Sequence, residues 1–334
     1  MIGEIGSEFW KKYDISDEKC DNEIIVLSGR TALDFIIRDL KISKSFNSIM
    51  LPSYCCDSMI APFIRNNIKV SFYCVRQDGI EYPINDADAV LLLDYFGYVD
   101  NQITDISHQA KFNGQTVIYD GTHYLGKREI DADYSFCSYR KWFFCNYATV
   151  TKQNGQWNVP YPVLTNEKYV TFRNKAAELK RQYIDKGNCE KKLFLDMFSD
   201  AEELLEKDYL NYYGEKVVCD EVYIAEKRRI NARRLVDGIC KIKEIKIWRE
   251  QIRDNDIPLF VPILVAENQR DELRKYLIDH EIYCPVHWPL SNLHGNINEI
   301  FNNELSLVCD QRYSLEEIDK EIEVVKNFFE GRTD

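Results

Sequence analysis

Asp120 and Lys141 are the two residues whose types and positions suggest chemistry. Asp120 ends a short apolar run at residues 117–120, and Lys141 ends a second β-rich run that closes with residues 138–141, Ser-Tyr-Arg-Lys. Two such runs in succession place a carboxylate and an amine at the ends of neighbouring strands. Pyridoxal phosphate (PLP) chemistry needs this pair, because the amine forms a Schiff base with the cofactor and the carboxylate keeps the pyridine nitrogen protonated. A buried structural aspartate and an ordinary surface lysine are the alternative reading.

The composition excludes several classes of protein. The chain of 334 residues has a formal charge of −12, from 43 Lys and Arg against 55 Asp and Glu. An acidic chain without a basic block is unsuited to nucleic acid. The sequence has no apolar run long enough to span a bilayer, and its start lacks the pattern of a signal peptide, so we expect a cytoplasmic protein without membrane association.

The cysteines and histidines predict neither disulfides nor a metal site. Eleven cysteines are scattered along the chain, with Cys55-Cys56 as the only adjacent pair and no Cys-x-x-Cys. Free thiols in a reducing compartment are the better interpretation. The five histidines show no zinc-ligand spacing, so no metal is expected.

Alternating strands and helices are predicted over the first half of the chain, where they would position the Asp120 and Lys141 pair. Short apolar runs occur at residues 24–27, 48–51 and 89–93, and helical patterns follow the first two. The run at 89–93 is apolar on both faces, which is typical of a central strand in a parallel sheet covered by helices. The pattern predicts an α/β fold whose ligand loops follow the carboxyl ends of the strands.

A turn of small residues, Ser28-Gly29, precedes the first predicted helix, which includes Thr31 and Ala32. Such a turn presents free backbone N–H groups to an anion and is a candidate phosphate cradle. A simple N-cap at Ser28 explains the same pattern. The residues alone leave both readings open.

The chain changes character near residue 220, where we place the boundary between a large domain, 1–220, and a small C-terminal domain, 221–334. Before the boundary, Asn154-Gly155 predicts a hairpin turn that leads into a strand at 156–159. Beyond it, the sequence predicts a basic helix over 223–240, a strand over 258–265 and helices over 269–280 and 315–329. A basic run on a helix is more often a solvated face than a binding surface.

Taken in order, these motifs resemble the DegT/StrS family of PLP-dependent sugar aminotransferases, from about residue 24 to the C-terminal helix. The matching segments are 28–33, 51–54, 95–97, 120–123, 138–141, 172–174, 228–231 and 309–313. The resemblance implies fold type I of the PLP-dependent transferases, with a large, mixed, mostly parallel sheet flanked by helices and a smaller C-terminal α+β domain.

The resemblance also implies which residues act on the cofactor ring. Lys141 would bind pyridoxal 5'-phosphate covalently and shuttle a proton, and Asp120 would pair with the pyridinium nitrogen. His123 would pack near the phenolic oxygen, although a lone histidine is more often a satisfied core residue. Tyr54 or one of the two cysteines after it would cover the ring, and we favour Tyr54.

For the phosphate of the cofactor, the resemblance implies three further residues. The backbone of Thr31 and Ala32 would hold it together with the hydroxyl of Ser138. Arg30 stands where many family members have threonine.

By the same resemblance, the protein is expected to be a homodimeric aminotransferase with a ping-pong mechanism. The amino donor would be glutamate and the acceptor a nucleotide-linked keto-sugar, in the synthesis of sugars for cell-surface polysaccharides. Other PLP chemistry on the same fold, such as a sugar dehydratase or lyase, is one alternative. A catalytically silent PLP-binding regulatory protein is another, with the basic helix as its binding surface.

The regulatory alternative arises from residues 143–148, which contain no glycine where the family has a glycine-rich segment. Side chains there are expected to occupy space that backbone would otherwise leave to the substrate or a partner subunit.

Overall fold

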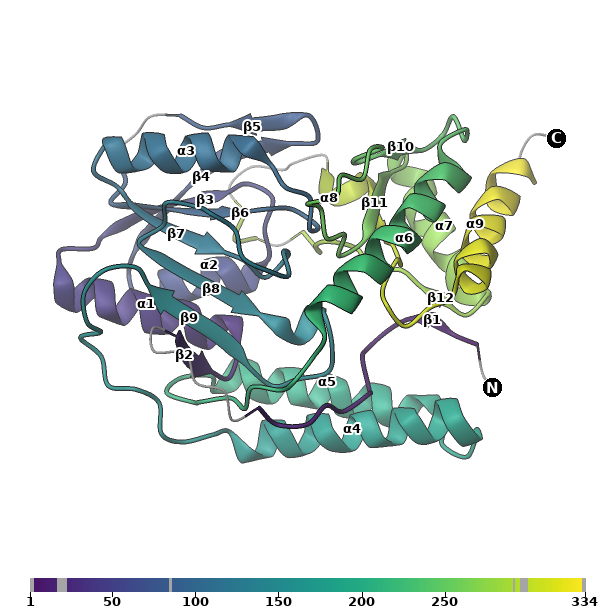
Figure 1. Ribbon diagram of the computed structural model, residues 1–334, viewed down its shortest axis with the longest axis horizontal. Helices are drawn as coiled ribbons and strands as arrows, with labels where there is room; N and C mark the ends of the chain where they lie inside the picture. The colour runs from purple at the N-terminus through teal and green to yellow at the C-terminus, as the bar shows by residue number, and fades with distance from the viewer. Residues whose placement is uncertain (1–2, 17–22, 84–85, 291, 295–299, 332–334) are drawn as a thin grey trace.

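An eight-stranded sheet forms the larger part of the computed structural model, which describes residues 3–16, 23–83, 86–290, 292–294 and 300–331 (Figure 1). Its strand order is β2-β9-β8-β7-β6-β3-β4-β5. The five strands β3, β4, β6, β7 and β8 are parallel, whereas β9, β2 and β5 are antiparallel to β8, β9 and β4. The bounds are β2 (Glu23–Val26), β3 (Ser48–Pro52), β4 (Lys69–Arg76), β5 (Gly79–Glu81), β6 (Ala89–Leu93), β7 (Thr116–Asp120), β8 (Tyr134–Ser138) and β9 (Ala148–Lys152).

The central strands β6 and β7 are buried along their whole length, as their unbroken apolar runs predict. Helices α1 (Gly29–Ser43) and α2 (Asp57–Arg65) lie on one side of the sheet and α3 (Asn101–Phe112) lies on the other (Figure 1). Asp120 is the last residue of β7 and pairs in register with Phe136 of β8. The expected α/β fold with a mostly parallel, mixed sheet is confirmed.

The predicted hairpin at Asn154-Gly155 is wrong. Residues 153–163, all of them described, contain no strand. The reason is topological, because β9 already has β2 and β8 as neighbours on its two edges and offers no free edge to a following strand. Instead, Trp157 packs against Phe35, with ring centroids 4.9 Å apart.

The C-terminal part contains a three-stranded sheet of order β10-β11-β13. Its helix α6 begins at Glu221, at the boundary predicted near residue 220. The elements are α6 (Glu221–Ile239), β10 (Lys246–Ile247), β11 (Val261–Leu264), α7 (Glu267–Asp279), β12 (Ile282–Tyr283), α8 (Ile300–Asn303), β13 (Glu304–Leu307) and α9 (Leu315–Glu330). Between the two sheets in sequence, α4 (Glu167–Lys186) and α5 (Lys191–Lys207) pack side by side (Figure 1).

The basic helix α6 is not a continuous solvated face. Arg228 is 1% exposed and donates to the carbonyl of Leu259 at 2.8 Å. Arg233 and Arg234 form ion pairs at 2.8 and 2.6 Å with aspartates of neighbouring segments. The sequence pattern missed the inward-facing arginine, because a charged run does not show which member a neighbouring strand will bury.

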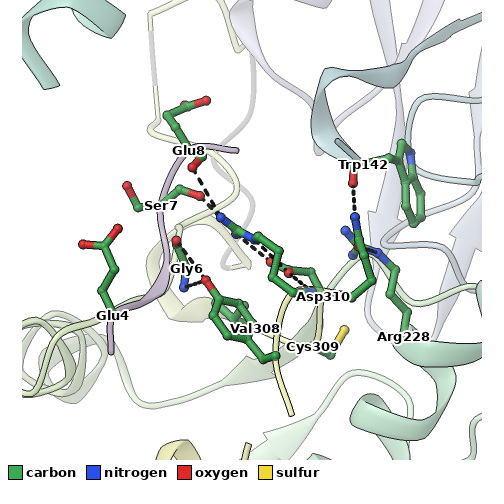
Figure 2. A network of polar contacts seen from close by, with 12 residues as sticks. Glu4, Gly6, Ser7, Glu8, Trp142, Arg228, Val308, Cys309 and Asp310 are labelled. Carbon is green, nitrogen blue, oxygen red and sulfur yellow. Dashed lines mark hydrogen bonds and ion pairs between the residues drawn. The ribbon is translucent and has the colours of Figure 1, made fainter. Parts of the chain in front are cut away.

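The N-terminal segment belongs in space with the C-terminal part of the chain. Strand β1 (Ile5–Gly6) pairs with β12, and Arg312 donates to the carbonyls of Ser7 and Glu8 at 3.2 and 3.3 Å (Figure 2). Lys180 of α4 donates to the same Glu8 carbonyl at 2.7 Å. The segment therefore ties the C-terminal part to α4 beside the site described next. Among the described residues, no helix combines the length and apolar character needed to cross a bilayer.

Candidate active site

Four of the predicted residues meet in one cavity at the carboxyl ends of β7 and β8. Asp120, His123, Ser138 and Lys141 line one space, which we call the central cavity. The rest of its wall is formed by Ser28, Gly29, Arg30, Leu33, Cys56, Ser58, Met59, Leu93, Thr122, Phe136, Arg140, Leu205 and Trp288.

Asp120 supplies a buried carboxyl group to the wall of the central cavity. It is 6% exposed, and burial raises its pKa to about 6, although the hydrogen bonds of Thr122 and the charge of Lys141 oppose this rise. The N–H of Thr122 donates to its Oδ1 at 2.8 Å and fixes the orientation of the carboxyl group. A protonated ring nitrogen at this position would supply the counter-charge that favours the ionised carboxylate.

Lys141 follows β8 on a single 3₁₀ turn, Tyr139–Lys141, which carries its side chain into the central cavity. Burial lowers the pKa of its ammonium group, and the neighbouring Arg140 lowers it further, while Cys56 and Asp120 raise it. Its Nζ lies 5.7 Å from the centre of the Trp288 ring. A buried lysine with a lowered pKa is more readily available as the neutral amine that attacks a carbonyl carbon.

Trp142 fixes the backbone that carries Lys141. Its indole N–H donates to the carbonyl of Thr122 at 2.9 Å, and its own carbonyl accepts from Nε2 of Gln311 at 2.6 Å. Arg228 completes the network by donating to Gln311 at 2.8 Å and lying 4.6 Å from the Trp142 ring centre (Figure 2). The position of the amine therefore depends on both the large sheet and the C-terminal part.

His123 and Trp288 form an aromatic wall of the central cavity. Their ring centroids are 5.5 Å apart at an interplanar angle of 25°. Burial lowers the pKa of His123 well below its usual value, and the charge of Lys141 adds to this effect. The N–H of Phe96 lies 3.3 Å from Nδ1 of His123, which assigns the proton of the neutral ring to Nε2. Sequence reasoning missed Trp288, because an extended segment between prolines carries no signal of which side chain faces a distant strand end.

The start of helix α1 also contributes to the wall of the central cavity, but Thr31 and Ala32 do not line it. The Thr31 N–H already donates to Oγ of Ser28 at 3.2 Å, and the Ala32 N–H donates to the Ser28 carbonyl at 2.9 Å. Gly29 and Arg30 line the cavity instead, and their N–H groups precede the first intrahelical hydrogen bond. Ser28 is thus an N-cap, and the helix start meets the cavity two residues earlier than expected.

Tyr54 does not line the central cavity either. Its side chain is fully buried among other aromatic rings, and its hydroxyl donates to the carbonyl of His287. Cys56, two residues later, does line the cavity, and Trp288 faces it from the C-terminal part. The expectation that Tyr54 covers a bound ring is not supported, because the loop after β3 places this side chain among rings of the C-terminal part, such as those of Trp248 and Phe301.

The glycine-free segment 143–148 does not fill the central cavity, although every one of its residues is described. Phe143 is fully buried and packs with Tyr13, with ring centroids 5.5 Å apart. Phe144 is 4% exposed and belongs to a cluster with Phe194 of α5. The bulky side chains therefore point into the protein's own interior, and the expected intrusion into the pocket is wrong for the cavity that contains Lys141.

The fold is shared with solved aminotransferases, whereas no protein-family model and no curated protein matches the sequence. Helicobacter pylori PseC, an aminotransferase of pseudaminic acid biosynthesis, matches with a TM-score of 0.65 at 14% identity, over 97% of this chain and 100% of that one. S. venezuelae DesV, solved with a ketimine intermediate, matches with a TM-score of 0.62 at 15% identity, over 95% and 86%.

Bacillus subtilis NtdA, solved with the bound cofactor PMP, has a TM-score of 0.61 at 15% identity, over 92% of this chain and 73% of that chain. At identities this low the likeness establishes the fold and not the activity. The chain described here has the mixed α/β fold of these aminotransferases.

Proposed function

We propose that the protein is a PLP-dependent aminotransferase that acts on a sugar. One observation carries the proposal: Lys141, Asp120 and the start of α1 line the same cavity. When bound, PLP supplies an electron sink for the reacting carbon and carries the amino group between donor and acceptor. The solved proteins that share the fold include sugar aminotransferases, which supports the same chemistry here.

The residues of the central cavity fit such a group from end to end. The N–H groups of Gly29 and Arg30 and the hydroxyl of Ser138 would hold the phosphate. A Cβ atom added to Gly29 would lie 3.4 Å from the Cβ of Ser138, so a larger residue would narrow the cradle. Asp120 would hold a proton on the ring nitrogen, and Trp288 would exclude water from one side.

Lys141 is the residue that would move protons. Its buried position favours the neutral amine, which would accept a proton from the reacting carbon of the substrate and return it to the carbon on the other side of the bridging nitrogen, two bonds away. Because Trp142 anchors the backbone at two points, the amine would keep one position through both half-reactions. Asp120 does not transfer a proton in this scheme but holds one at the ring nitrogen.

The substrates would enter from a second, larger cavity on the other side of Lys141. It is lined by Arg140, Arg173 and Arg274 among other residues, which suits substrates that carry negative charge. We place glutamate as the amino donor and a nucleotide-linked keto-sugar as the acceptor here, used in turn by a ping-pong mechanism. Both are anionic, which suits a lining whose basic side chains outnumber the acidic residues Glu8, Glu202 and Asp310.

A homodimer in the cytoplasm is the proposed setting. The loop before α4 exposes three large apolar side chains, Tyr161, Val163 and Leu164, with exposed fractions of 61%, 79% and 65%. A second copy of the chain would remove this surface from water. Light scattering after size-exclusion chromatography tests the dimer, and a monomer at micromolar concentration would contradict it.

The function is tested by incubating the PLP-loaded protein with glutamate and a panel of nucleotide-linked keto-sugars. We expect glutamate alone to abolish the absorbance band near about 420 nm in a single turnover, and a keto-sugar to restore it. Elimination or dehydration without any need for glutamate would instead indicate a lyase or dehydratase. Cofactor uptake with no reaction toward any amino donor would indicate a regulatory protein.

A further inference from the structure

We infer that the side chains of Arg30 and Arg140 bind the phosphate end of the cofactor, so that this chain supplies charge as well as backbone N–H groups to that anion. The inference rests on the proposed function, because it assumes that PLP occupies the central cavity. Both arginines line that cavity, as Ser138 does: Arg30 from the start of α1 and Arg140 from the turn after β8. Arg30 comes directly after Gly29, and Arg140 directly precedes Lys141.

The two arginines belong to a cluster of charged side chains around Glu202. Nη1 of Arg140 donates to Oε1 of Glu202 at 2.6 Å, and Arg30 and Arg173 approach the same carboxylate at 3.6 and 3.7 Å. Glu206, which is 66% exposed, lies 3.5 Å from Arg30, and the charge of Glu8 also acts on Arg140. Although burial acts in the opposite direction, the charges of Arg140 and Arg173 lower the pKa of Glu202 to about 2.

One donor of the cluster lies beyond hydrogen-bond distance of its ion-pair partner. Nη1 of Arg30 is buried and lies 3.6 Å from Oε2 of Glu202, and the described part of the chain gives it no hydrogen bond, although a guanidinium donor out of contact with water normally has one. The Arg30 side chain as a whole is only 16% exposed. An anion in the central cavity would accept a hydrogen bond from this donor, whereas no acceptor of the described protein residues does so.

A phosphate group fits this requirement better than a carboxylate does. It carries a charge of about −1.5 to −2 at neutral pH and has three acceptor oxygens. The N–H groups of Gly29 and Arg30, the Ser138 hydroxyl and two guanidinium groups would together surround such a group. Glu202 then acts as the counter-ion that holds Arg140 in the wall when no anion is bound.

The test compares PLP with pyridoxal, which lacks the phosphate, in titrations of the unliganded protein followed at the cofactor absorbance band. We expect Arg30→Gln to weaken PLP binding by about 10- to 100-fold, the range for one hydrogen bond between charged groups. Pyridoxal binding should change by less than about threefold. Arg30→Lys, which keeps a positive charge, should recover part of the PLP affinity.

Arg234→Gln is the matched control, because this arginine is 53% exposed and pairs with Asp319 far from the cavity. It should leave both affinities unchanged. Equal weakening of PLP and pyridoxal by Arg30→Gln, or no change in either, would overturn the inference.

A second measurement uses inorganic phosphate and does not depend on the proposed function. Phosphate at millimolar concentration should raise the melting temperature of the unliganded wild-type protein, and this rise should be reduced or lost in Arg30→Gln. If neither PLP nor pyridoxal produces an absorbance band but phosphate still stabilises through Arg30, the proposed function fails while the anion site stands. A phosphate effect that is the same in wild type and Arg30→Gln would contradict the anion site itself.

Discussion

Two pairs of residues in the wall of the central cavity differ in how their surroundings affect charge. Around Asp120 and Lys141, burial dominates: it raises the pKa of the carboxyl to about 6 and lowers that of the amine. Around Arg30 and Arg140, charge pairing outweighs burial and lowers the pKa of Glu202 to about 2. The first environment therefore weakens the ionised states of its groups, and the second preserves them.

The difference is consistent with the two tasks proposed for the cavity. A proton can be exchanged only by a group that is close to neutral at the working pH, and desolvation achieves this for a buried lysine. An anion is held best by groups that stay charged, and paired guanidinium groups do so at any physiological pH. The substitutions below test this difference between the two pairs of residues.

Replacing Lys141 by alanine removes the only amine among the residues that line the central cavity. We expect complete loss of the absorbance band near about 420 nm and of amino transfer, because no covalent bond to the cofactor can form. Lys243→Ala on the exposed surface is the control. A Lys141→Ala protein that keeps the band would show that another lysine binds the cofactor.

Asp120→Asn keeps the shape of the side chain but removes the charge at the ring end. The rate of the half-reaction with glutamate should fall by at least about 100-fold, comparable to the loss of one well-placed electrostatic group in other enzymes. Stopped-flow absorbance measures this rate on the PLP-loaded protein. Unchanged kinetics would mean that Asp120 does not hold the ring proton.

The same substitution should stabilise the unliganded protein at pH 8. The folded pKa of Asp120, about 6, lies above the ordinary value of 3.8, so stability is lost as pH rises through this window and stays low above it. Asparagine has no such loss and can still accept the Thr122 N–H. The gain should be on the order of 2 kcal/mol at pH 8 and vanish near pH 4, as urea denaturation at several pH values would show.

Glu202→Gln tests the ion pairs of Glu202 with the arginines. Here the expected change of stability with pH has the opposite sign to that of Asp120. The folded pKa of Glu202, about 2, lies below the ordinary value of 4.5, so its stabilising effect is present above pH 4.5 and is lost as pH falls toward 2. The wild type should therefore lose more stability than the variant between these two pH values. Parallel acid denaturation curves for the two proteins would contradict an ion pair at this position.

Tyr54→Phe should have the smallest effect. Its hydroxyl donates to the His287 carbonyl, and its loss leaves that carbonyl without this donor, at a cost of about 1 kcal/mol of stability. Because Tyr54 does not line the central cavity, PLP affinity and the absorbance band should stay unchanged. A shifted absorbance band would indicate that Tyr54 does contact the cofactor.

The strand ends were predictable from the sequence. Short apolar runs that end in Asp120 and just before Lys141 are typical of buried strands in a parallel sheet. The helix start was predictable only in part. A Ser-Gly turn indicates an N-cap or an anion cradle, and the choice between the Gly29 and Thr31 amides depends on which of them the cap itself occupies. That is a matter of two or three hydrogen bonds, which residue types do not specify.

From the sequence alone it was possible to predict the α/β order and to select Asp120 and Lys141, the two residues on which the proposed chemistry depends. Only the tertiary structure decided that Trp288 and Arg140 line the same cavity, that Arg228 is an internal anchor, and that residues 143–148 pack inward. The local sequence pattern predicts only the strand or helix to which a residue belongs. The distant residues that it contacts depend on tertiary packing: Trp142, for example, bonds to Thr122 and to Gln311, and no run of neighbouring residues indicates these contacts.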